Sequence, residues 1–271
     1  MTTIATTLPG ATRQRRPADR AGLRQSMRAE WTKLTSLRST KWALLITVII
    51  CALGTFLDTH GSVHHSRNWY RGFDPTNASL AGLAFSSLVI AVLAVLCMTG
   101  EYGSGTIRSS LTATPRRSVF YGAKVLVFGL VSVVLGFVLT AFSFFLGQAI
   151  LKAGGAPTAS LNTPGVLHVL VLSSLFFALL SLFGFGIGAV IRHTAGAIAT
   201  FYCATLLTAL LLRDVPGNPG RFTPEMIFGN SVASVVHQPN ALSSSAGFLL
   251  MALYTAVVVI AGGVVLARRD A

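Results

Sequence analysis

The run "LAGLAFSSLVIAVLAVLCMT", residues 80–99, contains no charged side chain over its whole length. About twenty apolar residues in an α-helix span the ~30 Å hydrocarbon layer of a bilayer. The run does not alternate between apolar and polar residues, as the strand of a membrane barrel must. A helix also satisfies its own backbone hydrogen bonds, which lipid cannot do. The stretch therefore predicts a transmembrane α-helix.

Other parts of the chain repeat this pattern. The further apolar runs are residues 41–57, 124–149, 166–190, 195–212 and 246–267. Hydrophobic residues make up 52% of the 271-residue chain and charged residues only 11%, whereas soluble domains carry about 25% charged residues. The mean hydropathy is +0.68. We predict an all-α integral membrane protein whose transmembrane domain, 41–267, has six transmembrane helices.

The basic residues are distributed unevenly between the two sides that six spans define. Of the 21 Lys and Arg residues, sixteen fall on the side that holds both termini and five on the other. The positive-inside rule then places both termini in the cytoplasm. We expect a multi-pass protein of the cell (plasma) membrane. This asymmetry accounts for the net charge of +13 without a nucleic-acid partner.

The segment before the first span divides into two parts. Residues 1–20 lack apolar periodicity and are basic, which favours a disordered cytoplasmic tail. Residues 21–40 predict an amphipathic helix that lies along the bilayer surface, with a basic face opposite an apolar one. An ordinary solvated helix is the alternative. The apolar positions, three or four residues apart, are Leu23, Met27, Trp31, Leu34 and Leu37.

Several classes of membrane protein lack support. The spans carry essentially no ionisable residue at their centres, and we expect Lys124 and His168, near span ends, to reach the interface. This argues against proton-coupled transport and voltage sensing. His60, His64 and His65 have no carboxylate or cysteine at ligand spacing, so we expect no metal site. No G-x-x-x-x-G-K-[ST] loop is present, so the chain should not bind ATP itself.

Smaller features give further expectations about packing. Cys51, Cys97 and Cys203 lie in apolar runs and should be small buried residues. Gly184 and Gly188 have the small-xxx-small spacing that lets a neighbouring helix approach closely. A short helix is expected at about 224–236, with Thr223 as its N-cap.

A polar stretch, "GEYGSGTIRSSLTATPRR" at residues 100–117, separates the second and third spans. Glu101 stands at the end of the second span, and a short helix is predicted over 106–113. Ile107 and Leu111 are four residues apart, so this helix could offer a small apolar face to a soluble partner. The alternative is a solvated loop whose arginines only fix the topology.

Two motifs resemble those of a known family. The pattern Glu101-Tyr102-x-x-Gly105-Thr106-x-Arg108-x-x-Leu111-x-x-x-Pro115-x-Arg117, ending in Ala123-Lys124, looks like the cytoplasmic loop of type-2 ABC transporter permeases. The segment "MRAEWTKLTSLRSTKWAL", residues 27–44, is similar to the basic amphipathic lead-in of the same family.

The resemblance implies a partner and a set of working residues. Two permease copies, in a homodimer or heterodimer, would pair with separately encoded cytoplasmic ABC ATPase subunits that hold ATP and Mg²⁺. This chain would bind no cofactor. The loop would form a coupling helix that sits in a cleft of the ATPase, and the interfacial helix would lie beside it. The implied coupling residues are Glu101, Gly105, Thr106, Arg108, Leu111 and Pro115, and those of the interfacial helix are Glu30 and Trp31.

We therefore expect the permease subunit of an ABC exporter, not an enzyme. The scarcity of polar side chains in the spans favours an amphipathic or lipid-like solute, and drug or antibiotic efflux follows from the resemblance. A membrane-anchored sensor or scaffold and an intramembrane enzyme are the alternatives. Against the enzyme, the sequence has no G-x-S-x-G motif and no paired nucleophile and base in the spans.

Overall fold

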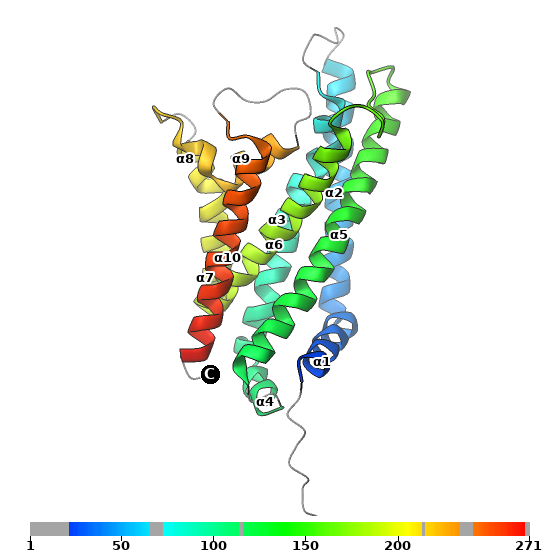
Figure 1. Cartoon of the computed structure of the whole chain (residues 1–271). Coiled ribbons are helices and arrows are strands. Elements are labelled where there is room, and N and C mark those ends of the chain that lie inside the picture. The colour runs from blue at the N-terminus through cyan, green and yellow to red at the C-terminus, as the bar shows by residue number, and fades with distance from the viewer. Residues whose placement is uncertain (1–21, 66–72, 114–115, 213–214, 233–240, 269–271) are drawn as a thin grey trace, which may run out of the picture.

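A computed structural model describes residues 22–65, 73–113, 116–212, 215–232 and 241–268. Every regular element in these ranges is a helix (Figure 1). The elements are α1 Leu23–Ser36, α2 Arg38–His65, α3 Pro75–Gly103, α4 Thr106–Ala113, α5 Arg117–Ala153, α6 Val166–Ile191, α7 Thr194–Tyr202, the π-helical turn Cys203–Leu207, α8 Thr208–Leu212, the 3-10 turn Pro219–Phe222, α9 Pro224–Ser231 and α10 Ser244–Arg268.

Six of these helices are long and apolar enough to cross a bilayer, which confirms the predicted fold class. They are α2, α3, α5, α6, the continuous α7–α8 segment and α10. In Figure 1 they run roughly side by side, with α1, α4 and the last turn of α10 at one end and α9 at the other. We call these the α4 end and the α9 end.

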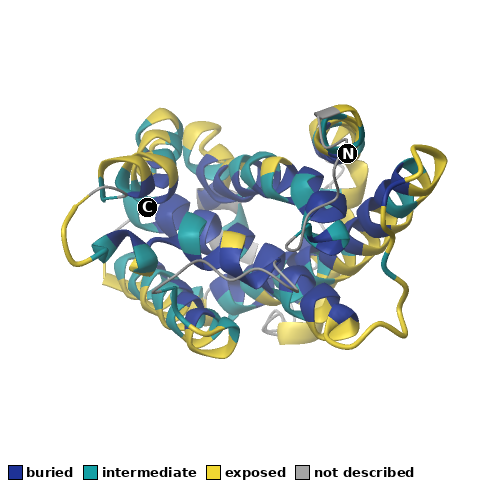
Figure 2. Ribbon diagram, turned by 90° about the horizontal axis from the view of Figure 1, so that it is seen from above, coloured by how far each residue is buried: buried dark blue, intermediate teal, exposed yellow. Residues whose placement is uncertain are grey.

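Helices α3 and α6 form the centre of the bundle. More than half of the most apolar stretch of each is buried, against a third or less in the other spans. Seen from above, the buried ribbon lies in the middle and the exposed ribbon at the rim (Figure 2). The fully buried Phe176, Phe177 and Phe185 all belong to α6. The rim helices expose long apolar side chains, as helices in contact with lipid do.

Glycines allow the central helices to touch. A Cβ on Gly184 would lie 2.9 Å from the carbonyl oxygen of Ala91, and one on Gly188 would lie 3.2 Å from Val95. The spacing of these glycines thus serves the α3–α6 contact, a detail that the sequence leaves open. Gly82 of α3 packs still closer, against the carbonyl oxygen of Cys51 in α2.

A buried polar seam joins α2, α3 and α5. The hydroxyls of Thr55 and Ser143 lie 2.6 Å apart, and Ser143 donates to the carbonyl oxygen of Ser79 at 2.6 Å. Gln148 donates to the Ser79 hydroxyl at 3.0 Å. Such bonds between helices hold a bundle together where no hydrophobic force acts between apolar surfaces in lipid. These three helices therefore form one packed unit.

The fifth span is interrupted by the π-helical turn at Cys203–Leu207. A π-turn inserts an extra residue and changes which side chains face the neighbours. Cys203 is exposed, so the expectation that it is buried is wrong, whereas Cys51 is fully buried. Periodicity within an apolar run cannot show which face meets lipid.

Two helix starts show different caps. Helix α9 is Pro224–Ser231, and Thr223 is its N-cap residue as predicted; residues 233–236 of the predicted helix lie outside the described residues. The Thr223 hydroxyl donates to the carbonyl oxygen of Gly220 at 2.7 Å, so it caps no N–H of α9. Helix α3 has the stronger cap, because Asp74 accepts hydrogen bonds from the N–H groups of Thr76 and Asn77.

Candidate functional site

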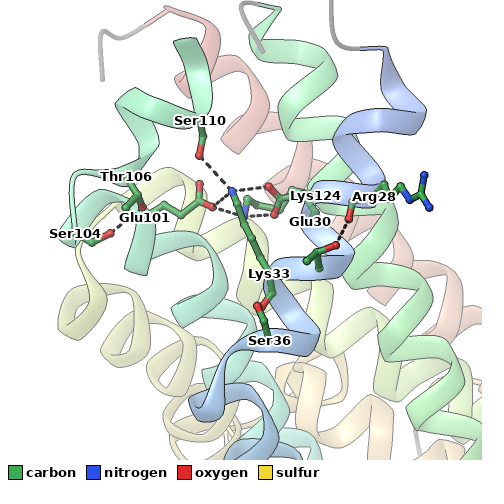
Figure 3. Close-up of polar contacts among 10 residues, drawn as sticks. Arg28, Glu30, Lys33, Ser36, Glu101, Ser104, Thr106, Ser110 and Lys124 are labelled. Atoms are coloured by element: carbon green, nitrogen blue, oxygen red, sulfur yellow. Dashed lines mark hydrogen bonds and ion pairs between the residues drawn. The ribbon is translucent and has the colours of Figure 1, made fainter. Parts of the chain in front are cut away.

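Four charged side chains meet at the α4 end of the bundle (Figure 3). Glu30 and Lys33 come from α1, Glu101 from the last turn of α3, and Lys124 from α5. Lys124 Nζ lies 2.6 Å from Glu30 Oε2 and 2.9 Å from Glu101 Oε1. Lys33 Nζ lies 2.9 Å from Glu30 Oε1 and 2.9 Å from Glu101 Oε1. We call this group the ion cluster.

The ion cluster is a closed arrangement of alternating charges. Both carboxylates bridge the two ammonium groups, so each charge has two opposite neighbours. Lys33 also donates to the hydroxyl of Ser110 in α4 at 3.2 Å. The ring of Phe120 lies 5.8 Å from Lys33 Nζ and 5.6 Å from Lys124 Nζ, within the range of cation–π attraction. The cluster therefore connects α1, α3, α4 and α5.

Burial makes this pairing necessary. The side chain of Lys124 is 3% exposed, that of Glu30 5% and that of Glu101 12%, whereas Lys33 is 41% exposed. A charge removed from water at this depth is strongly destabilising unless opposite charges lie next to it. Lys124 meets these charges inside the protein, because α1 and α3 bring two carboxylates to its ammonium group; the expectation that it reaches the membrane interface stays a prediction.

One side of α1 packs on the bundle. Ser26 and Glu30, one turn apart, are its buried residues. Met27 and Leu34 beside them are half-buried, whereas Trp31 is 51% exposed. Glu30 therefore reaches the bundle from the buried side of α1.

Electrostatics favour the charged form of Lys33. Burial of its ammonium group acts to lower its pKa, but hydrogen bonds to Glu101 and Glu30 outweigh this effect, and the pKa is raised. The contribution of Lys33 to stability is therefore fully present below its ordinary value of 10.5 and is lost only as the pH rises beyond it. Lys33 therefore keeps its charge in the cluster across physiological pH.

A tight turn places α4 beside the cluster. Gly105, between α3 and α4, has a φ of +70°, a left-handed conformation that glycine adopts without steric cost. The hydroxyls of Ser104 and Thr106 lie 2.9 Å apart across this turn. Of the residues assigned to coupling, Glu101 thus belongs to the cluster, whereas Gly105 and Thr106 form the turn and the start of α4.

Helix α4 spans the residues that the sequence predicts, but Ile107 is turned toward the bundle. Ile107 is 3% exposed and packs in the core, so the prediction that it faces a partner is wrong. Ser104, Gly105 and Thr106 are exposed and form the accessible part of this turn. The side chains of Arg108 and Leu111, and all of Pro115, lie outside the described residues.

A second set of contacts ties the same end of the bundle to α10. Arg192, in the connection between α6 and α7, donates to the carbonyl oxygen of Val265 at 2.9 Å. Its guanidinium lies 5.0 Å from the ring of Tyr102, the residue after Glu101. Arg117 donates to the carbonyl oxygen of Leu266 at 3.2 Å. We call this set the arginine clasp.

Sequence reasoning placed Glu30 and Glu101 near the coupling element but missed Lys33, Ser110, Lys124 and Arg192. One signal in the sequence could have indicated the cluster: an ionisable residue inside a spanning segment usually pairs with an opposite charge. Lys124 stands in such a segment, and the chain has only eight acidic residues. Trp31 lies on the exposed face of α1, away from the cluster.

The fold and the cluster define a class of protein. This is a helical membrane protein with six spans, in which a short helix at one end is tied to a surface helix and to the central spans. The sequence profile of the ABC-2 family transporter proteins matches residues 26–211, more than half of the chain. The chain therefore belongs to the ABC-2 transporter family and is a membrane permease. The matched region includes most of α1, all of α4 and all four residues of the ion cluster.

A comparison with curated protein sequences finds no match to this chain. Membership of the family therefore does not identify the substrate of this chain. No group of three or more metal-ligating side chains is present among the described residues.

Proposed function

We propose that this chain is the permease subunit of an ABC exporter and that α4 receives motion from a separate cytoplasmic ATPase. The observation that carries this proposal is the contact of α4, through Ser110 and the ion cluster, with three other helices. A soluble loop that only fixed topology would not need buried charges beneath it. Family membership supports the ATPase partner.

Two routes would carry the motion of α4 into the bundle. The first runs through Lys33 to α1 and through the shared carboxylates to α5. The second runs from Tyr102 through Arg192 to the last turn of α10. Together they reach both the α2–α3–α5 unit and the α6–α10 side. ATP binding on the partner would act by stabilising one orientation of these parts over another.

The finer features of the function belong to the same proposal. The α4 end would face the cytoplasm of a cell whose plasma membrane holds the chain, with ATP and Mg²⁺ bound on the ATPase. A second permease copy would complete the pathway. The scarcity of polar side chains in the spans supports an amphipathic or lipid-like solute. Coupling would involve Glu101, Gly105, Thr106, Arg108, Leu111 and Pro115, with Glu30 and Trp31 in the interfacial helix.

Co-purification with the candidate ATPase tests the docking of α4. Ser104→Arg places a long charged side chain on the exposed turn, while Ser160→Arg makes the same change on an exposed residue at the α9 end. We expect Ser104→Arg to reduce ATPase binding and Ser160→Arg to leave it unchanged. Equal binding by both variants and the unchanged chain would contradict docking through α4. Binding without transport-linked ATP hydrolysis would favour a scaffold.

A further inference from the structure

A hollow lies where α1 meets the first span. Its volume is about 300 Å³, and Arg38, Lys41, Trp42 and Leu45 line it. These residues occupy the first two turns of α2 at spacings of three and four, so they share one face of the helix. The opposite face of α2 packs on the bundle through Thr40 and Thr47, which are buried. The hollow therefore opens away from the protein core.

The two cations in this hollow lack a protein counter-charge. Within the described parts of the chain neither Arg38 nor Lys41 forms an ion pair or a side-chain hydrogen bond. The ion cluster already uses Glu30 and Glu101. Both cations are exposed and lie three residues apart, within reach of one anionic group. Their charge complements an anion that does not belong to the described protein.

The side chains that line the hollow change from charged to apolar along α2. Trp42 is 64% exposed and Leu45 47% exposed, and exposed apolar side chains continue along the helix at Ile49 and Leu53. Tryptophan is enriched at the level of lipid headgroups. A ligand that fits this surface has an anionic group at one end and a long apolar chain at the other. A free phosphate would satisfy only the first part.

We propose that this hollow binds the headgroup of an anionic phospholipid. The phosphate would lie between Arg38 and Lys41, with one acyl chain along Trp42, Leu45 and Ile49. Because Leu37 alone separates α2 from α1, a lipid held here would fix the angle at which α1 leaves the first span. If the proposed function holds, α1 connects this lipid to the ion cluster, so anionic lipid would also affect coupling. The binding itself does not depend on transport.

Fluorescence of Trp42 tests the site directly. The chain has only three tryptophans, Trp31, Trp42 and Trp69, so Trp31→Phe/Trp69→Phe leaves Trp42 as the sole reporter. This variant is reconstituted in phosphatidylcholine vesicles containing a small fraction of lipid brominated on its acyl chains. We expect brominated phosphatidylglycerol to quench Trp42 well beyond its bulk fraction. Brominated phosphatidylcholine should quench only in proportion to its abundance.

A matched pair of charge variants separates the site from general attraction to anionic lipid. Arg38→Gln/Lys41→Gln should lower the preference for phosphatidylglycerol by roughly 25-fold, the effect expected of two cations near an anionic surface. Arg24→Gln/Arg28→Gln removes the same charge from exposed positions on α1 outside the hollow and should lower the preference clearly less. Inorganic phosphate in excess should not abolish the quenching, because it lacks an acyl chain.

Three results would overturn the proposal. Equal quenching by the two brominated lipids would show that no headgroup is selected. An equal loss of preference in both pairs of variants would show diffuse attraction instead of a site. Complete displacement by inorganic phosphate would indicate a site for a soluble anion. Retention of phosphatidylglycerol on the purified chain, measured by native mass spectrometry, should follow the same order among the variants.

Discussion

Replacing Lys124 with methionine removes one of the two cations in the ion cluster while keeping a side chain of similar length. Glu30 and Glu101, both largely buried, then depend on Lys33 alone. The cluster changes from neutral to a net charge of −1. Lys33 is more than a third exposed, so it cannot compensate for both carboxylates in a dry environment.

The magnitude follows from burial. Removal of one partner from a buried ion pair costs about 3–5 kcal/mol, because the other charge remains desolvated and unpaired. Lys33→Met also leaves the cluster with a net charge of −1, but Lys33 is 41% exposed, so water can partly solvate the carboxylates that it leaves and the cost should be smaller. We expect Lys124→Met to be clearly the more destabilising. Glu30→Gln/Lys124→Met restores neutrality with Lys33 and Glu101 still paired, and should recover part of the loss.

Equilibrium unfolding in mixed micelles, followed by circular dichroism, measures these free energies. A double-mutant cycle on Glu30 and Lys124 then gives their coupling energy. We expect the double variant to be more stable than Lys124→Met alone. If the two single losses simply add, or if Lys33→Met costs as much as Lys124→Met, the account of a buried, mutually neutralised cluster is wrong.

Two further predictions concern the rest of the bundle. Gly82→Ala should destabilise the protein by about 1–3 kcal/mol, because its Cβ would meet the Cys51 carbonyl oxygen. Gly100→Ala is the control, since a Cβ there meets open space and should not destabilise the protein. Thermal unfolding compares the two variants, and equal melting temperatures would count against the close packing of Gly82. Burial raises the pKa of Glu225, so its ionised form is disfavoured in the folded state, and the stability it contributes falls as the pH rises through its ordinary value of 4.5. Glu225→Gln should therefore unfold at a higher temperature than the unchanged chain at pH 7, with an advantage that shrinks as the pH falls toward 4.5. An advantage independent of pH would refute this reasoning.

The spans and α4 could be predicted from the sequence because their signals are local. Twenty apolar residues determine a span, and Gly105 with the polar residues around it determines where α3 gives way to α4. The ion cluster could not be predicted in the same way. Lys124 lies 94 positions from Glu30 and 23 from Glu101, and only the packing of α1 on α5 brings them together.

The errors have the same origin. Ile107 was expected to face a partner and Cys203 to be buried, yet Ile107 lies in the core and Cys203 faces outward. Both residues belong to helices whose orientation depends on their neighbours. For Cys203, both the core and the lipid-facing surface of a span are apolar, so hydrophobicity does not tell one face from the other. For Ile107, an apolar side chain on a short helix can face the bundle as readily as a partner.

The most direct test of the central claim is a pair of distances measured across the ATPase cycle. Spin labels on Thr32→Cys in α1 and Thr112→Cys in α4, both at exposed positions, report whether the two helices move together. Labels on Thr32→Cys and Ser160→Cys report movement relative to the α9 end. The native cysteines are replaced in both cases.

The account predicts that ATP binding to the assembled complex leaves the Thr32–Thr112 distance unchanged and alters the Thr32–Ser160 distance. Separation of α1 from α4 when ATP binds would contradict it, because the ion cluster would then not transmit the motion. Two unchanged distances would contradict the proposed function itself.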